Sequence, residues 1–298
     1  MNKNIITLNK DLQIIDLCLY LRKHNALVIS DIHIGYEEAL NKQGILIPRL
    51  QFQQTMKRIE NDINNVLEIN KDTNKNNIKN NQKANIAPKL DFIIINGDLK
   101  HEFGTISETE WRQTLKFVDF LATKTERIIL IKGNHDTILE PIAKKRNLKI
   151  VEEYSLGNED GNGYSEFYFC HGDKIPSTDS FKKAKTVIIG HEHPAISFKE
   201  NLRTEKFKCF MFGKFKPKKK LSLKKLFKGH SNLINTNTKN LIVLPSFNLV
   251  TEGTDVLKEN LLSPFLNQSL DNFEVYVVPD SKRILYFKKV KDILKFVS

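Results

Sequence analysis

The sequence has 298 residues, of which 40% are hydrophobic, and this is enough to bury the core of one domain or two. No apolar run approaches the roughly 20 residues that span a bilayer, and the N-terminus lacks the apolar segment of a signal peptide. The three cysteines, Cys18, Cys170 and Cys209, are too widely spaced for a disulfide framework. These features argue against a membrane protein and a disulfide-rich secreted domain, so we expect a cytoplasmic protein that has no membrane contact.

The formal net charge of +12 is concentrated in one part of the chain. Residues 199–228 contain twelve Lys or Arg and two Glu, a net charge of +10, so the rest of the chain carries only +2. A basic segment of this kind suggests an anionic partner for that segment rather than for the whole fold.

Short apolar runs, typical of strands buried on both faces, recur along the chain. They occupy residues 26–30, 92–95, 128–131, 167–170 and 186–189, and further strand-like segments occupy 241–244, 273–278 and 283–287. Helical spacing of apolar residues predicts helices over 48–69, from a capping box at 107–110 through 121, and over 137–146. Strands alternate with helices early and crowd together late, which predicts an α/β fold with two mixed β-sheets packed face to face and helices outside.

Two segments do not fit this pattern and are predicted to be insertions into a single domain spanning residues 1–298. Residues 70–89 consist largely of Asn and Lys with few bulky side chains, which indicates a disordered surface insertion. Residues 214–240 carry most of the basic segment and are predicted to be a second insertion.

Five of the apolar runs end in residue types that bind metal ions. These residues are Asp31 and His33, Asp98, Asn134 and His135, His171, and His191 and His193. Because the carboxyl ends of parallel strands meet at one edge of a sheet, we expect these side chains to converge there. A single Asp-x-His would be an ordinary turn, but five such strand ends together predict a site.

The ligand types indicate the chemistry. Carboxylates, imidazoles and an amide oxygen, without thiolates, suit Mn²⁺, and Fe²⁺ or Zn²⁺ as alternatives, better than they suit a Cys-rich structural site. The set exceeds the needs of one ion but would serve two ions about 3.5–4 Å apart. Such a pair activates water and neutralises charge on a phosphate, so we expect phosphoester hydrolysis by a metal-activated hydroxide.

The ordered motifs of residues 31–193 resemble those of the calcineurin-like metallophosphoesterase superfamily. They are Asp31-x-His33, Gly97-Asp98, Gly133-Asn134-His135-Asp136, His171-Gly172 and Gly190-His191-x-His193. The segments 31–38, 97–103 and 244–248 further resemble the archaeal SbcD-related phosphoesterase group. The resemblance implies a four-layer sandwich of two sheets flanked by helices, and a domain that often forms homodimers.

The resemblance also implies a role for each residue. Asp31, His33 and His193 would hold one metal ion, Asp98 would bridge to the second, and Asn134, His171 and His191 would complete the second site. His135 would stabilise the phosphoryl oxygens or protonate the leaving group, and Asp136 would orient its imidazole. We expect Glu192 to point away from the metals and Cys170 to belong to the core.

Two features allow more than one interpretation. His101, three residues after Asp98, would either contact substrate at the rim of the cleft or have a structural role. Residues 214–228 alternate Lys with Leu and Phe, so they would either contact the phosphates of DNA or RNA near the active cleft or form a solvated surface insertion.

The favoured function is therefore a two-metal phosphoesterase that acts on phosphodiesters of nucleic acid. A phosphoesterase for small nucleotides or phosphoproteins is an alternative with the same chemistry. A nucleic-acid-binding module with a vestigial metal site is an alternative of another class, although a vestigial site has no need for both His135 and Asp136.

Overall fold

The computed structural model describes residues 4–77, 89–104, 106–146, 148–157, 164–216 and 238–297. Within these ranges the α-helices are α1 (Tyr36–Lys42), α2 (Gln51–Asn77), α3 (Glu108–Lys124), α4 (Glu140–Arg146), α5 (Asp179–Lys183) and α6 (Val290–Val297). Two 3₁₀ turns, η1 (Arg22–His24) and η3 (Pro264–Leu266), complete the helical elements.

The first sheet contains seven strands in sequential order from β1 to β7. They are β1 (Ile5–Thr7), β2 (Leu12–Ile15), β3 (Cys18–Leu21), β4 (Ala26–Ile29), β5 (Leu90–Asn96), β6 (Thr125–Ile131) and β7 (Lys149–Val151). The pairs from β1 to β4 are antiparallel, whereas β4, β5, β6 and β7 run parallel to one another. The parallel strands are the ones that lead into the predicted ligand residues.

The second sheet has the strand order β14-β11-β12-β13-β10-β9-β8, with β15 between β12 and β16. Its strands are β8 (Glu153–Leu156), β9 (Phe167–Cys170), β10 (Thr186–Ile189), β11 (Pro194–Glu200), β12 (Arg203–Phe215), β13 (Lys239–Val243), β14 (Thr254–Asp255), β15 (Glu274–Asp280) and β16 (Arg283–Lys289). Strands β9, β10 and β13 are parallel and most of the others are antiparallel, so this sheet is mixed as well.

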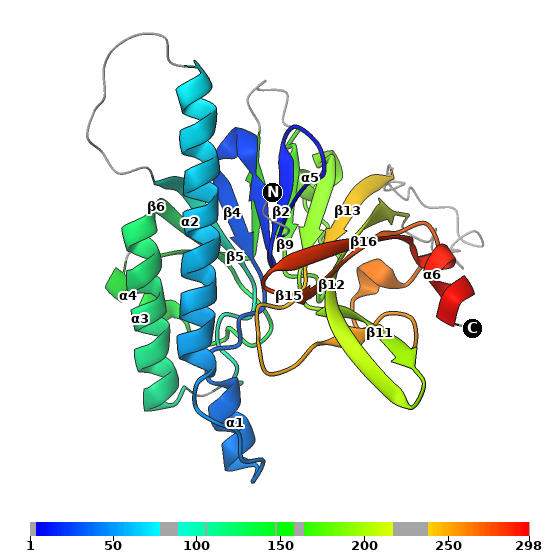
Figure 1. The fold of residues 1–298 in the computed structure, drawn as a ribbon. Helices are drawn as coiled ribbons and strands as arrows, with labels where there is room; N and C mark the ends of the chain where they lie inside the picture. Colours follow the sequence, from blue (N-terminus) through cyan, green and yellow to red (C-terminus); the bar gives the residue numbers. More distant parts are fainter. Residues whose placement is uncertain are drawn as a thin grey trace, which may run out of the picture.

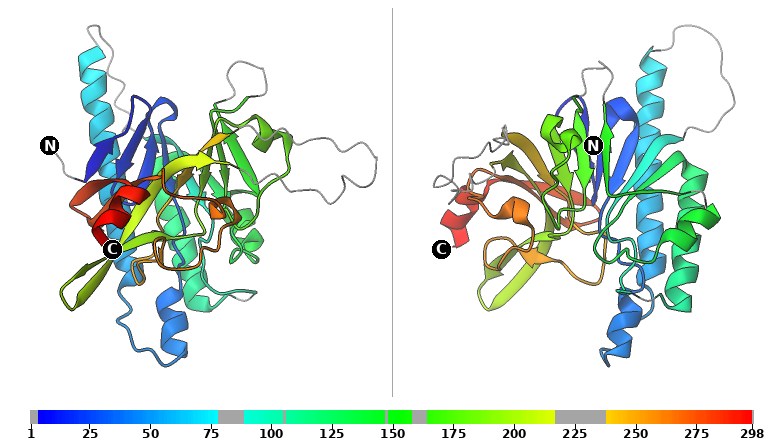
Figure 2. Two further views of the ribbon diagram at one scale, coloured as in Figure 1. Left: turned by 90° about the vertical axis from the view of Figure 1, so that its right-hand side faces the viewer. Right: turned by 180° about the vertical axis from the view of Figure 1, so that it is seen from behind.

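The two sheets pack against each other and helices cover their outer faces. Figure 1 shows α2, α3 and α4 along the outside of the first sheet, and α6 on the opposite side of the molecule beside β16. The two views of Figure 2 show the same layers from the side and from behind. The predicted fold class, two mixed sheets flanked by helices, is confirmed.

Alternation along the strands of the second sheet explains why both of its faces are buried. Phe167 and Phe169 of β9 belong to the large core between the sheets, whereas Tyr168 and Cys170 belong to a second core on the outer face. Successive side chains of a strand point to opposite faces, so an uninterrupted apolar run serves two cores at once. Cys170 is 4% exposed and lies in the second core, as expected.

The structure differs from the sequence prediction around both insertions. Helix α2 extends to Asn77, so the part of the predicted disordered insertion from residue 70 to 77 is helical, and residues 78–88 lie outside the described residues. A helix that already exists gains one hydrogen bond for each residue added, so a polar Asn- and Lys-rich sequence can continue it. Of the basic insertion, residues 217–237 lie outside the described residues, between the paired strand ends Phe215 and Lys239.

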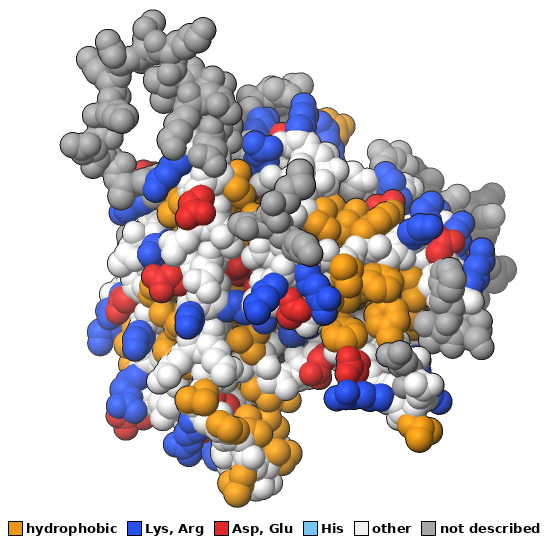
Figure 3. Space-filling model, viewed as in Figure 1, with side chains coloured by type: hydrophobic (Ala, Val, Ile, Leu, Met, Phe, Trp, Pro, Cys, Tyr) orange, Lys and Arg blue, Asp and Glu red, His pale blue; other side chains and the backbone are white. Residues whose placement is uncertain are grey.

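The surface carries both signs of charge. In the view of Figure 3, Lys and Arg side chains are interspersed with Asp and Glu, and hydrophobic side chains gather at the lower end, where Figure 1 places α1. Ile45 and Leu46, which follow α1, are 52% and 87% exposed. None of the helices in the described ranges is long and apolar enough to cross a membrane.

Candidate metal centre

The loops that follow five parallel strands converge on one site, and both sheets contribute. Strands β4, β5 and β6 of the first sheet lead to Asp31 and His33, to Asp98, and to Asn134 and His135, respectively. Strands β9 and β10 of the second sheet lead to the remaining ligand residues, which are His171, His191 and His193. The structure therefore brings together all of the residues that the strand ends predicted.

The backbone at this site is unusual. Five of the predicted ligands have left-handed backbone conformations, namely Asp31 (φ 51°), His33 (φ 50°), Asp98 (φ 44°), His191 (φ 63°) and His193 (φ 49°). Such conformations cost on the order of 1–3 kcal/mol each in non-glycine residues, and they cluster at functional sites where the surrounding structure enforces them. Here, His33 N donates to Asp98 O at 2.9 Å, and His191 N donates to Asp31 Oδ2 at 3.1 Å.

Two glycines allow the strand ends to approach each other. A Cβ atom on Gly97 would lie 2.0 Å from His171 Nδ1, and one on Gly133 would lie 2.1 Å from Asp98 Oδ1. Any other residue at either position would displace a predicted ligand. The Gly-Asp and Gly-Asn-His-Asp motifs therefore require glycine because the ligand side chains lie so close to its backbone. The turns that the motifs make are a second reason.

The first group of ligand atoms consists of Asp31, His33 and His193. His33 Nε2 lies 3.3 Å from His193 Nε2, and His193 Nε2 lies 3.4 Å from Asp31 Oδ1. Ser30 Oγ donates to Asp31 Oδ2 at 2.5 Å, and this bond fixes the orientation of the carboxylate.

The second group consists of Asp98, His171 and His191, with Asn134 beside them. His171 Nε2 lies 3.3 Å from Asp98 Oδ2, 3.1 Å from His191 Nδ1 and 2.9 Å from Asn134 Oδ1. Asp98 Oδ2 also lies 3.7 Å from His33 Nε2 of the first group. Asp98 therefore approaches residues of both groups, and Asp31 Oδ1 approaches the second group in the same way, at 3.7 Å from His171 Nδ1.

The donor atoms of these residues and their separations suit bound metal ions. Two nitrogens bound to one ion at 2.0–2.1 Å are separated by roughly 3 Å, which is the separation of the imidazole nitrogens within each group. His171 Nδ1 is buried without a hydrogen-bond partner among the described residues. A buried polar atom of this kind is costly unless another group satisfies it. The two groups together provide for two divalent ions, with nitrogen and oxygen ligands and no thiolate.

Two of the ligands, His33 and Asp98, have protonation states that suit a bound cation. Burial lowers the pKa of His33, and the nearby His193 lowers it further, to about 3. Burial alone would raise the pKa of Asp98, but its hydrogen bond to His171 and the nearby imidazoles hold the pKa of this carboxyl well below its usual range. His33 is thus neutral and Asp98 ionised near pH 7, which are the protonation states that a metal ligand requires. Burial alone would lower the pKa of His171, but its hydrogen bond to Asp98 and the nearby carboxylates raise this pKa to about 9, so a metal ion would displace the proton of this ring.

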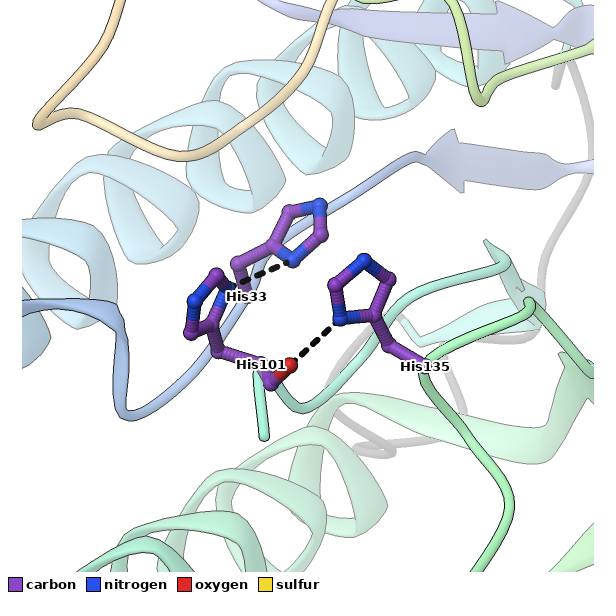
Figure 4. Close-up of side chains that lie close together, drawn as sticks. All are labelled: His33, His101 and His135. Atoms are coloured by element: carbon purple, nitrogen blue, oxygen red, sulfur yellow. Dashed lines mark hydrogen bonds between the residues drawn. The ribbon is translucent and has the colours of Figure 1, made fainter. Parts of the chain in front are cut away.

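His135 lies at the edge of the two groups. Its ring Nε2 is 3.9 Å from Asp98 Oδ2, and its backbone N–H donates to Asp98 Oδ1 at 2.9 Å. Its ring Nδ1 donates to the carbonyl oxygen of His101, as Figure 4 shows. The ring is therefore held with Nε2 directed toward the site, where it can meet a substrate.

The role expected of Asp136 is wrong in one respect. Its buried carboxylate accepts hydrogen bonds from the backbone N–H groups of Gly133, Leu99 and Lys100 at 3.0–3.3 Å. No hydrogen bond joins it to the His135 ring among the described residues; the carbonyl of His101 orients that ring instead. Burial raises the pKa of Asp136 to about 6, with the charge of Asp98 as the next cause. Asp136 ties together the loops that carry Asp98 and Asn134.

His101 contacts the centre from the side of α1. Its Nδ1 lies 3.3 Å from His33 Nδ1, and its ring packs on Tyr36 with centroids 4.3 Å apart. Figure 4 shows His33, His101 and His135 grouped around the same point. These three could in principle hold a further ion. However, His33 already directs Nε2 to the first group, and His135 Nδ1 is bonded to a carbonyl, so this trio does not offer a free ligand set.

Several residues that support the site were not assigned a role from the sequence. Ser246 Oγ and Asn248 N both donate to Asp31 O, at 2.7 and 3.1 Å, and Phe247 N donates to Ser30 O at 2.8 Å.

Glu110 was predicted only as part of a capping box. Ser107 Oγ does accept from Glu110 N at 3.1 Å, but the Glu110 carboxylate accepts from His101 N and Glu102 N. Glu192 points away from the centre, as expected, and accepts from Leu262 N and Ser263 N.

A cavity of about 430 Å³ opens beside His171. Its lining includes Lys132 and Lys174, and both ammonium groups lie within 4 Å of Glu152. Asp173 also lines it, so the wall has both signs of charge. The cavity provides space for a substrate next to the second group. Because its charges are mixed, its wall alone does not attract a polyanion.

The fold and the ligand set define a class of enzyme. The sequence model of the calcineurin-like phosphoesterase family matches residues 24–268, so the chain belongs to this family and is a metal-dependent phosphoesterase, a hydrolase.

Solved structures include one that shows the same fold. The crystal structure of Pseudomonas putida nuclease MPE is similar with a TM-score of 0.55 and 16% sequence identity, covering 95% of this chain and 98% of that chain. The protein of unknown function AQ665 from Aquifex aeolicus has a TM-score of 0.34 and 16% identity, covering 56% of this chain and 78% of that chain. Vacuolar protein sorting 29 from Cryptosporidium parvum has a TM-score of 0.34 and 13% identity, covering 89% and 97%. No curated protein matches the chain.

Proposed function

We propose that this protein is a two-metal phosphodiesterase that acts on nucleic acid. The observation that carries the proposal is the assembly of two ligand groups around Asp98, with the His135 ring held beside them. The fold similarity to a nuclease, together with the localised positive charge of residues 199–228, supports nucleic acid as the substrate class.

We assign metal binding to the strand-end residues. One ion would be held by Asp31, His33 and His193, and the other by Asn134, His171 and His191, with Asp98 shared. Divalent ions bound there would supply Lewis-acid chemistry that activates water and neutralises the charge of the phosphate, and Mn²⁺ suits this donor set best.

His135 would act on the leaving oxygen. Its Nδ1 proton is committed to the carbonyl of His101, so Nε2 carries a proton only when the ring is charged. The charged ring can donate to a phosphoryl oxygen and pass its proton to the leaving oxygen. Asp136 would maintain the loop geometry on which the position of His135 depends.

The first test removes the shared carboxylate. We expect the wild-type protein with Mn²⁺ to hydrolyse bis(p-nitrophenyl) phosphate and a single-stranded oligonucleotide. Asp98→Asn should lower kcat/KM on both by at least about 1,000-fold, and it should reduce the Mn²⁺ bound per chain as measured by mass spectrometry of the metal. Asp179→Asn, an exposed carboxylate on α5, is the matched control and should change neither.

The substrate panel separates the alternatives. Hydrolysis of the aryl ester without any cleavage of DNA or RNA would reject nucleic acid and favour a small nucleotide or phosphoprotein. Nucleic-acid binding without hydrolysis of any ester would favour a binding module with a vestigial centre. Activity of Asp98→Asn at the wild-type level would contradict the metal assignment.

A further inference from the structure

An exposed aromatic side chain lies on the proposed proton donor. Phe103 is 58% exposed, and its ring centroid is 3.7 Å from that of His135 with an interplanar angle of 34°. One face of the Phe103 ring therefore covers the imidazole, while much of the ring remains accessible to solvent. A single exposed apolar side chain is ordinary on a protein surface, so the informative feature of Phe103 is its stacking on the His135 ring rather than its exposure.

The segment that carries Phe103 is held in place by its neighbours. Glu110 Oε1 accepts from Glu102 N at 3.0 Å, and the buried Lys100 ammonium donates to Glu102 O. On the other side, Gly104 N donates to Thr137 Oγ1 at 3.3 Å. Phe103 is thus presented from a short segment fixed on both sides, which is the preorganisation that a binding platform requires.

We propose that Phe103 is the stacking platform for the nucleobase on the leaving side of the scissile phosphate. This inference rests on the proposed function, because it assigns His135 to the leaving oxygen. A nucleoside whose oxygen meets His135 Nε2 must extend past that ring, and Phe103 is the aromatic surface next to it. Every base has a π-face, so a platform of this kind binds nucleic acid without reading its sequence.

The structure around Phe103 favours a base over other occupants. Lys42 lies 3.6 Å from the Glu102 carboxylate, so this nearby cation is already paired with a carboxylate. The ring itself offers stacking but no hydrogen bond. Recognition by Phe103 is therefore aromatic rather than ionic, which separates it from phosphate binding by the metal ions.

The test compares dinucleotides with and without the base. We would measure kcat/KM with Mn²⁺ on thymidylyl-thymidine and on the two analogues that lack either the 5′ or the 3′ base. Stacking of one base contributes roughly 5- to 150-fold in binding, so removal of the leaving-side base should lower kcat/KM of the wild type by a factor in this range. Removal of the other base should have a smaller effect.

Variants of Phe103 assign that loss to the platform. Phe103→Leu should abolish the difference between the intact substrate and the leaving-side abasic analogue, whereas Phe103→Trp should keep or enlarge it. Because the ratio is taken within each variant, any effect of the substitution on His135 cancels. Tyr286→Leu, which removes a 50% exposed aromatic ring from β16, is the control and should keep the wild-type ratio.

Two results would overturn the platform, and they are distinguishable. If Phe103→Leu keeps the wild-type ratio, the platform is wrong and the proposed function stands. If the wild type hydrolyses bis(p-nitrophenyl) phosphate but none of the dinucleotides, the nucleic-acid substrate is wrong and the base platform falls with it.

Discussion

His101 supports the centre through two different groups. Its ring nitrogen faces His33 Nδ1 at 3.3 Å, and its carbonyl accepts from His135. A metal-binding nitrogen must be unprotonated, so a neutral His33 that binds through Nε2 carries its proton on Nδ1, where His101 can accept it. A partner of this kind fixes the ring and raises its basicity as a ligand. We therefore favour a positioning role for His101 over a direct contact with substrate.

His101→Ala should weaken Mn²⁺ binding by roughly 10- to 100-fold, because it removes the acceptor of His33 and leaves the backbone carbonyl that holds His135. The measurement is a Mn²⁺ titration by calorimetry, together with kcat at saturating Mn²⁺, which should recover much of the wild-type value. His101→Asn retains an acceptor oxygen and should restore part of the affinity. An increased substrate KM with unchanged Mn²⁺ affinity would instead assign His101 to substrate binding.

The sequence identified residues that the structure brings together, and it was less informative about what each of them contacts. Strand-end Asp, Asn and His residues are visible as motifs because the chemistry requires those residue types in those places. The partner of His135 is a backbone carbonyl, which no residue type encodes. Asp136 was assigned to His135 because it follows it, whereas the turn directs its carboxylate to three backbone N–H groups instead.

Between elements, a buried ionic cluster joins the β2–β3 turn to α2. Asp16 accepts from Arg58 Nε and an Nη at 2.5 and 2.7 Å, and the Cys18 thiol lies 3.7 Å from Asp62 Oδ2. Asp16 and Asp62 are both buried, and the charge of Arg58, which is hydrogen-bonded to Asp16, also acts on Asp62. Burial raises the pKa of Asp62 well above its ordinary value, and the charge of Asp16 raises it further.

The elevated pKa of Asp62 determines how stability depends on pH. A carboxyl whose pKa is higher in the folded than in the unfolded protein binds more protons when folded, so the free energy of unfolding falls as pH rises from the unfolded pKa toward the folded one. We expect Asp62→Asn to raise the free energy of unfolding at pH 8, by about 1.4 kcal/mol for each unit by which the folded pKa exceeds the unfolded one. The gain should shrink as the pH falls toward the unfolded pKa of about 3.9, and it should vanish below that pH, where Asp62 is protonated in the folded and the unfolded protein alike.

The measurement is urea unfolding of both proteins at pH 4, 6 and 8. Asp16→Asn is the matched control of opposite sign, because it removes the partner of Arg58 and should destabilise the protein by roughly 3 kcal/mol. A difference between Asp62→Asn and the wild type that is the same at every pH would show that the carboxyl does not titrate as inferred.

The strands that lead into the ligand motifs were predicted, whereas the hairpin of β2 and β3 was not. The core runs before the ligand residues appear as β4, β5, β6, β9 and β10. Strands β2 and β3 have four residues each, as β9 and β10 do, but their turn at Asp16 has a positive φ without glycine, so no local signal marks the hairpin. Their existence depends on tertiary packing, including the pairing of Asp16 with Arg58, 42 residues away.

For the whole molecule, the centre exists because two sheets meet. His33 and His193 are 160 residues apart and belong to loops of different sheets. Their proximity depends on how the sheets pack, which the sequence indicates only through the order of its motifs. The same topology also places the two strand ends that flank residues 217–237. Residues Thr186–Ile189 of β10 pair in parallel with Asn240–Val243, and β10 leads to His191 at its carboxyl end.

Lys239, where the chain returns from residues 217–237, is therefore at the opposite end of the sheet from the centre. Four strand residues at about 3.3 Å each place this junction roughly 13 Å or more from the loop that carries the ligands. One of the two interpretations of residues 214–228 was a phosphate contact near the active cleft, but the described residues on either side of 217–237, Phe215 and Lys239, lie away from it. We therefore expect residues 214–228 to contribute to binding of long nucleic acids and to have little effect on catalysis.

Replacing the six lysines of residues 218–228 by Gln tests this separation. For single-stranded DNA, each phosphate contact contributes about −0.7 to the slope of log K against log salt concentration, so the slope should become less steep by at most about 4. Fluorescence anisotropy with a 30-nucleotide strand between 50 and 250 mM NaCl measures the slope, and thymidylyl-thymidine should be cleaved with unchanged kcat/KM.

The control carries the same loss of charge at six exposed positions elsewhere, which are Lys57, Lys116, Lys144, Lys145, Lys282 and Lys291. An equal change of slope in both variants would show that only net charge matters, and a loss of dinucleotide cleavage would place the segment at the active site after all.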